Sequence, residues 1–432
     1  MVNRALVSVA VAVGAFISVV VLLTRLGGGQ SVFESDPWRV LYQGDVACVA
    51  LCAVVAVVGS VLMGRSLVFF VGGAGLVALG AVAAVGTTAN WASYVSAVAA
   101  GLLIAAIGSL AVQEDSRESL QSWLFAGALV GAWLARPLEQ YRSSVPYSGA
   151  YTSTGTPPDW PLVVGVVAAL VLFAAARFTG PPHARFPDEN GRSATQRSAL
   201  GPTLTLGIAV PVVALLSWWW FIATLGSGDD IEGGTWAYGI VLLPVIVVGV
   251  WWLPHRNGLV LLAMLAMLTA AAGLPQWQGS WPMLLVFVLL IAGGLVSGRR
   301  WAHPMIAMGV LLACTLMTAI DESPWSTAGI VAAFVVPVAG AHVVAACLPT
   351  TAPVSTIAVA GPATLFPVVG ITVAYSFSSS SGSSGSSGFD SRQLTTTEVI
   401  LAAVTVAACG IALAFLSRRR PPSDLDEKGL PA

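Results

Sequence analysis

Runs of about twenty apolar residues recur along the whole chain and limit its fold more than any other feature. A helix that crosses the hydrocarbon core of a bilayer needs about 20 mostly apolar residues, and it satisfies its backbone polar groups internally. The sequence therefore predicts an all-α integral membrane protein of about 14 transmembrane helices. The candidate spans are 5–24, 46–63, 67–86, 91–112, 119–138, 160–177, 203–225, 236–253, 258–275, 281–298, 304–320, 328–348, 354–375 and 399–416.

The composition excludes the other broad classes. Only 9% of the residues are charged and 56% are hydrophobic, whereas roughly a quarter are charged in an ordinary soluble domain. The 19 basic and 20 acidic residues leave a net charge of −1, so no nucleic-acid partner is indicated. The expected partner is the lipid bilayer, and the sequence leaves the oligomeric state open. The first span follows Arg4 without an Ala-x-Ala-like cleavage site and is expected to remain attached.

The arginines predict how the chain is threaded. Basic residues favour the cytoplasmic side, and fourteen spans with cytoplasmic N- and C-termini place fourteen of the 19 basic residues inside. Omitting the short span 119–138 would move most of them outside. Of the basic residues, only Lys428 is a lysine and the others are arginines. This preference for arginine, together with the many Ala, Val and Gly residues, suggests a GC-rich bacterial genome. We therefore expect a bacterial plasma membrane.

Two similar turns indicate an internal repeat. The second span ends in Gly59-Ser-Val-Leu-Met-Gly-Arg65, and the tenth ends in Gly293-Gly-Leu-Val-Ser-Gly-Arg-Arg300. The two turns and the helix count resemble the fourteen-helix branch of the major facilitator superfamily, which implies two six-helix halves and two extra helices. The expected parts are a first half (1–177), a linker (178–200), two extra helices (201–256), a second half (257–417) with a Ser/Gly outer loop (376–391), and a tail (418–432).

Few polar residues are candidates for a substrate site. No charged residue lies at the centre of a span, although ion-driven pumps usually keep a carboxylate there. Arg136 and Glu139 flank Pro137 near the outer end of the fifth span, where they are either an interfacial ion pair or part of a substrate path. His342 is the only histidine well inside a span. It is either satisfied by a neighbouring helix or a proton relay.

A broken helix is the other candidate. Gly361-Pro362 and Pro367 interrupt the thirteenth span, and proline removes a backbone hydrogen bond. Broken helices at membrane depth line cavities or are packed in protein. The pattern favours a transporter-like, non-enzymatic protein for a lipophilic or weakly polar substrate.

Two alternatives remain open. Glu34 and Asp36 lie in the first outer loop, where a carboxylate is suited to act as general base in a polytopic glycosyltransferase that uses lipid-phosphate sugars. The third possibility is a non-catalytic scaffold of the cell envelope or a subunit of a membrane complex. No cofactor motif or metal-ligand spacing is present, and all five cysteines lie in apolar runs.

Overall fold

A computed structural model describes the helices of the chain and a few residues beside them. The described residues are 2–25, 45–63, 67–85, 90–111, 117–143, 159–179, 194–226, 242–253, 257–271, 274, 281–318, 327–350, 354–360 and 396–419. They contain no strand. The helices are α1 (Val2–Arg25), α3 (Asp45–Leu62), α4 (Val68–Val85), α5 (Asn90–Leu110), α6 (Arg117–Ser143), α7 (Trp160–Thr179), α8 (Ala194–Gly226), α10 (Leu242–Trp252), α11 (Leu259–Ala271), α12 (Trp281–Arg300), α13 (Pro304–Met317), α14 (Thr327–Ala346) and α16 (Thr396–Arg419), with a short helical segment at 354–360.

The protein is an all-α integral membrane protein, as the sequence predicts. Within the described part of the chain, eight helices are long and apolar enough to cross a membrane, namely α1, α4, α5, α7, α8, α12, α14 and α16. The apolar parts of the remaining helices are shorter, and these helices are α3, α6, α10, α11 and α13. Every predicted span contains a helix, although only 354–360 of the thirteenth is described and α10 begins at Leu242. The helix α6 continues through Pro137 to Ser143.

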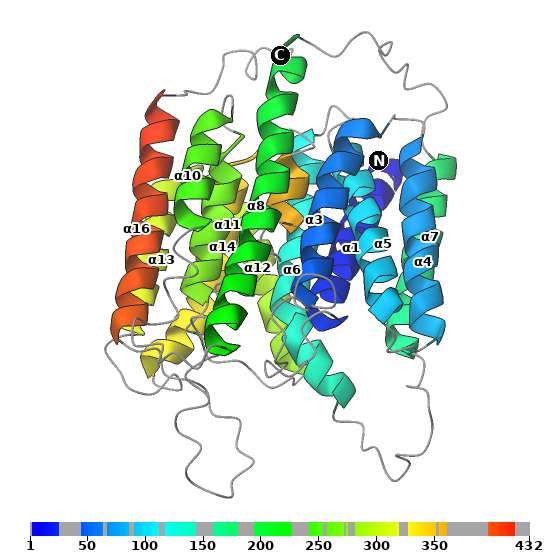
Figure 1. Cartoon of the computed structure of the whole chain (residues 1–432), viewed down its shortest axis with the longest axis horizontal. Coiled ribbons are helices and arrows are strands. Elements are labelled where there is room, and N and C mark those ends of the chain that lie inside the picture. The colour runs from blue at the N-terminus through cyan, green and yellow to red at the C-terminus, as the bar shows by residue number, and fades with distance from the viewer. Residues whose placement is uncertain are drawn as a thin grey trace, which may run out of the picture.

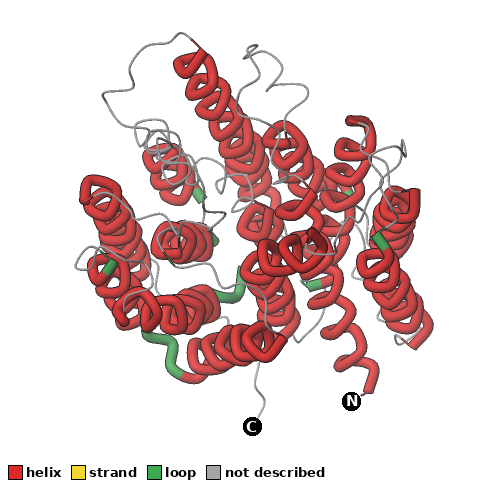
Figure 2. Tube along the Cα trace, turned by 90° about the horizontal axis from the view of Figure 1, so that it is seen from below, coloured by secondary structure: helices red, strands yellow, loops and turns green. Residues whose placement is uncertain are grey.

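The helices stand side by side in one bundle (Figure 1), and Figure 2 shows many of them nearly end-on. The first helix, α1, begins at the upper end of the bundle in Figure 1, and α16 finishes at the same end. An even number of crossings places the two ends of a chain on one side, so this arrangement agrees with fourteen spans. We use upper end and lower end in the sense of Figure 1.

Glycines let neighbouring helices approach closely at two interfaces. A Cβ atom on Gly127 of α6 would collide with the backbone of Ala12 in α1, and one on Gly131 would lie 2.9 Å from the Phe16 carbonyl oxygen. The same spacing recurs in α12, where Cβ atoms on Gly294 and Gly298 would collide with backbone carbonyls of α14. Small residues four apart allow this contact in membranes, where packing rather than hydrophobicity holds helices together. Gly127 and Gly131 thus form a close-packing pair against α1.

Helix packing early in the chain recurs late in the chain. In the first set of helices, which is α1 and α3 to α7, the packed pairs include α3 with α5, α4 with α5, α4 with α7, α1 with α5 and α1 with α7. In the second set, which is α11 to α14, segment 354–360 and α16, the packed pairs include α12 with α14, α13 with α14, α13 with α16, α11 with α14 and α11 with α16. Each pair of the first list has its counterpart in the second, in chain order.

The helices α8 and α10 connect the two sets. The helix α8 packs against α3 of the first set and against α10, while α10 packs against α11 and α16 of the second set. The sets also meet directly where α6 contacts α12 and α14. The surface between the two sets is therefore formed largely by α6 on one side.

Candidate functional site: the contact between the two helix sets

One face of α6 carries the contact with the second set. Gln121, Phe125, Leu129 and Trp133 follow one another at intervals of four residues, and this spacing places side chains along one side of a helix. From the upper end to the lower end, this face begins with the polar Gln121, continues with the apolar Phe125 and Leu129, and ends with Trp133.

The upper part of this face is a pair of hydrogen bonds between side chain and backbone. Gln121 is fully buried, and its Oε1 accepts a hydrogen bond of 2.8 Å from the Thr350 backbone N–H. Its Nε2 donates one of 2.5 Å to the Thr350 carbonyl oxygen. The amide thus satisfies both backbone groups of Thr350, which lies just after α14 and is itself fully buried. The Thr350 hydroxyl adds a contact of 2.7 Å with the Ser355 hydroxyl.

Segment 354–360 lies deep in the protein at the same end. All seven of its residues are buried, and Ser355 and Thr356 are fully so. The Thr356 hydroxyl lies 3.3 Å from the hydroxyl of Ser60 in α3, so a second polar contact joins the two sets. Ser60 also donates to the Val57 carbonyl within its own helix, which leaves its oxygen to accept from Thr356. Buried hydroxyls in such contacts exchange protein partners for water at little net cost when a contact opens.

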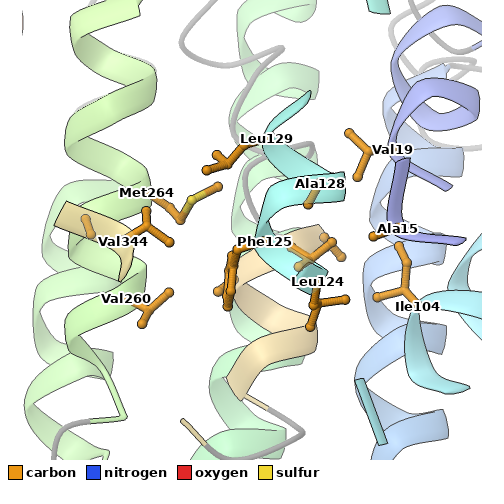
Figure 3. Packing of buried hydrophobic residues seen from close by; sticks show 14 of the residues in the cluster. Ala15, Val19, Ile104, Leu124, Phe125, Ala128, Leu129, Val260, Met264 and Val344 are labelled. Atoms are coloured by element: carbon orange, nitrogen blue, oxygen red, sulfur yellow. The ribbon is translucent and has the colours of Figure 1, made fainter. Parts of the chain in front are cut away.

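The middle of the face is apolar. Figure 3 shows Phe125 and Leu129 directed toward Val260 and Met264 of α11 and Val344 of α14, while Leu124 and Ala128 face Ala15, Val19 and Ile104 of the first set. Phe125 has no exposed surface and Met264 is 4% exposed. Among the side chains that the structure describes, no charged one is buried.

The lower part of the face is aromatic. The ring of Trp133 in α6 lies 6.0 Å from that of Phe287 in α12. Phe287 stacks on Phe334 of α14, with ring centroids 5.8 Å apart and an interplanar angle of 12°. Three rings from both sets therefore join the sets below the apolar middle.

His342 holds two helices of the second set together. Its Nδ1 lies 2.9 Å from the Ser297 hydroxyl oxygen of α12, and that oxygen also lies 2.9 Å from the Gly294 carbonyl oxygen. Nδ1 donates to the Ser297 oxygen or accepts from its hydroxyl, according to which ring nitrogen carries the proton. The other ring nitrogen, Nε2, is buried without a hydrogen-bond partner among the described residues. The structure thus places His342 in the contact between α12 and α14.

Of the other predicted site residues, the structure describes the positions of only two. Arg136 and Glu139 lie three residues apart in α6, beyond Trp133. Glu34 and Asp36, as well as Gly361, Pro362 and Pro367, lie outside the described residues. Sequence reasoning missed Gln121, Thr350, Ser60 and Thr356. The four-residue spacing from Gln121 to Trp133 was a signal, but it does not say which helix this face contacts.

The described residues offer no cluster of three or more His, Cys, Asp or Glu side chains that could hold a metal ion. All five cysteines are buried, and none forms a disulfide with another described residue. They pack as small apolar side chains.

Comparison with known protein families and with characterised proteins finds no match. Among solved structures, the chain is similar to a mutant of the peptide transporter POT crystallised in complex with alafosfalin. The TM-score is 0.48 and the sequence identity 14%, over 96% of this chain and 94% of that chain. A similarity at this level establishes neither a shared fold nor a shared substrate.

Proposed function

We propose that the protein is a transporter for a lipophilic or weakly polar substrate, in which the two helix sets move relative to each other. They correspond to six-helix halves at 1–177 and 257–417, with the two extra helices within 201–256 between them. This arrangement is the one implied by the resemblance to the fourteen-helix branch of the major facilitator superfamily.

The main support for this proposal is the surface between the two sets, which changes from polar to apolar to aromatic along its length. Hydrogen bonds join the sets near Gln121 and Ser60, aromatic rings join them near Trp133, and apolar side chains fill the space between. Polar and aromatic contacts at opposite ends are suited to open in turn. The middle layer, with Phe125 and Met264, is suited to an apolar ligand, because pockets for such ligands are lined mainly by hydrophobic side chains.

We assign a role in the motion to the thirteenth span, which the sequence predicts to be interrupted at Gly361-Pro362. Segment 354–360 is buried next to α3, and the sequence continues directly into Gly361-Pro362. Discontinuous helices are a recurring element of transporters. We propose that the predicted interruption lets the upper contact separate without moving the whole span.

A reversible cross-link tests the proposed motion. Ser60→Cys combined with Thr356→Cys places two thiols where the native oxygens lie 3.3 Å apart. In proteoliposomes loaded with lipophilic fluorescent compounds, oxidation should stop transport and reduction should restore it. The matched control is Ser297→Cys with His342→Cys, which joins α12 and α14 within one set, and its oxidised form should transport as fast as its own reduced form. Full transport by the oxidised Ser60/Thr356 pair would contradict the proposal, as would the absence of transport of any compound.

A further inference from the structure

We propose that the upper ends of α10 and α16 form a binding site for the phosphate headgroup of an anionic membrane lipid. This inference concerns the outer surface of the bundle and does not depend on the transport proposal. It is based on one cluster, Trp251, Trp252, Phe415, Arg418 and Arg419, which we call the α10–α16 cluster.

Three of these side chains form a stack. The rings of Trp251 and Phe415 lie 5.3 Å apart at an interplanar angle of 26°. The Arg419 guanidinium lies 4.2 Å from the Phe415 ring centroid and 5.9 Å from that of Trp251. A guanidinium over aromatic faces is held by cation–π attraction. Its planar edge still carries N–H donors, which suit the oxygens of a phosphate.

The cluster is open at the membrane surface. Trp251 is 52% exposed and Trp252 is 62% exposed, and Arg418 and Arg419 are exposed as well. No acidic residue occurs in α10, and the only one in α16 is Glu398 at its opposite end. Within the described chain, the two helices therefore offer two positive charges without a carboxylate of their own at this end.

Below the cluster, the same helices present a surface for an acyl chain. Val248 of α10 is 65% exposed, and Ile411 of α16 is 72% exposed. Tryptophan favours the level of the lipid headgroups, and basic residues attract anionic lipids there. The combination of an arginine pair, two tryptophans and an apolar strip thus fits one lipid with an anionic head, and a free phosphate would leave the strip unused.

The chain contains a second arginine pair that serves as a control. Arg299 and Arg300 end α12, are exposed and lie at the same end of the bundle. No ring stacks on either of them among the cation–π contacts of the described residues. Replacing this pair removes the same charge without touching the α10–α16 cluster.

Native mass spectrometry of the purified full chain, titrated with phosphatidylglycerol or phosphatidylcholine, tests the site. Phosphatidylglycerol should bind more tightly. Arg418→Gln with Arg419→Gln should weaken its binding by about 25-fold, which is about five-fold for each basic residue at an anionic surface. Arg299→Gln with Arg300→Gln should weaken it by less than about three-fold. An unchanged melting temperature shows that each variant is folded.

Three results with the lipids and the arginine variants would overturn the site. They are equal binding of the two lipids by the unmodified chain, equal losses in the two arginine variants, and displacement of phosphatidylglycerol by millimolar inorganic phosphate. A variant without residues 421–432, which removes Asp424, Asp426 and Glu427, should bind phosphatidylglycerol at least as tightly as the full chain. Weaker binding by that variant would place the contact on the tail and would also overturn the site.

Discussion

Replacing Gln121 by methionine should destabilise the protein more than any other single loss of a buried polar side chain described above. Methionine has nearly the same length as glutamine, so packing changes little. Both backbone groups of the fully buried Thr350 lose their side-chain partner. A buried hydrogen bond contributes about 0.5–1.5 kcal/mol net, so the loss of two lowers the free energy of unfolding by about 1–3 kcal/mol.

A buried serine offers a matched comparison. Ser18 is also fully buried, but its hydroxyl donates to the Gly14 carbonyl at 2.8 Å within α1. That carbonyl keeps its normal helical hydrogen bond when the hydroxyl is removed. Ser18→Ala should therefore cost less than about 1 kcal/mol.

Reversible unfolding in mixed detergent micelles measures both variants against the unmodified protein. A Gln121→Met variant as stable as Ser18→Ala would refute the reasoning, because the amide would then not be needed to satisfy Thr350. Gln121→Asn separates the two effects further, since it keeps the amide but shortens its reach. Asparagine should recover little of the lost stability.

Four further predictions concern packing, threading and the proposed path. Gly294→Ala should lower the melting temperature, because its Cβ would collide with the Val338 carbonyl, whereas Gly293→Ala next to it meets no atom within 4 Å and should be neutral or stabilising by thermal unfolding. Cysteines at Ser148 and Ser383 should react with an impermeant thiol reagent added to intact cells and a cysteine at Ser193 should not; labelling at Ser193 would reverse the threading. If Arg136 and Glu139 line the path, Arg136→Ala and Glu139→Gln should each abolish transport at unchanged abundance, and two silent variants would remove them from it. Pro362→Ala should slow transport more than Glu34→Gln or Asp36→Asn, and a dominant effect of either carboxylate would favour the transferase, since losing a general base costs about 10² to 10⁴ in rate.

The sequence predicts the helices well because the bilayer demands them. Each of the fourteen apolar runs contains a helix, and even the short run 119–138 does so, within α6. Glycine spacing also identifies one contact surface in advance, since Gly127 and Gly131 allow α1 to approach α6. Both features depend on local composition, which a sequence displays directly.

The contact between the sets could not be predicted in the same way. Gln121 and Thr350 are 229 residues apart, and nothing in their neighbourhoods links them. In a membrane, a helix face that meets lipid is as apolar as one that meets protein. The face of α6 with Phe125 and Leu129 therefore cannot be distinguished from a lipid-facing surface by its hydrophobicity. The partner of His342 could not be predicted either, because Ser297 lies on another helix.

The distance between the two helix sets at the upper end is a direct test of whether the sets move relative to each other. Spin labels at Leu62 at the end of α3 and Trp301 just after α12, which are 76% and 68% exposed, report this distance by pulsed electron resonance. If the two sets move, two distance populations should appear in liposomes, and only the shorter should remain after the Ser60→Cys/Thr356→Cys pair is oxidised. A single distance that is the same before and after oxidation would show that the sets do not move.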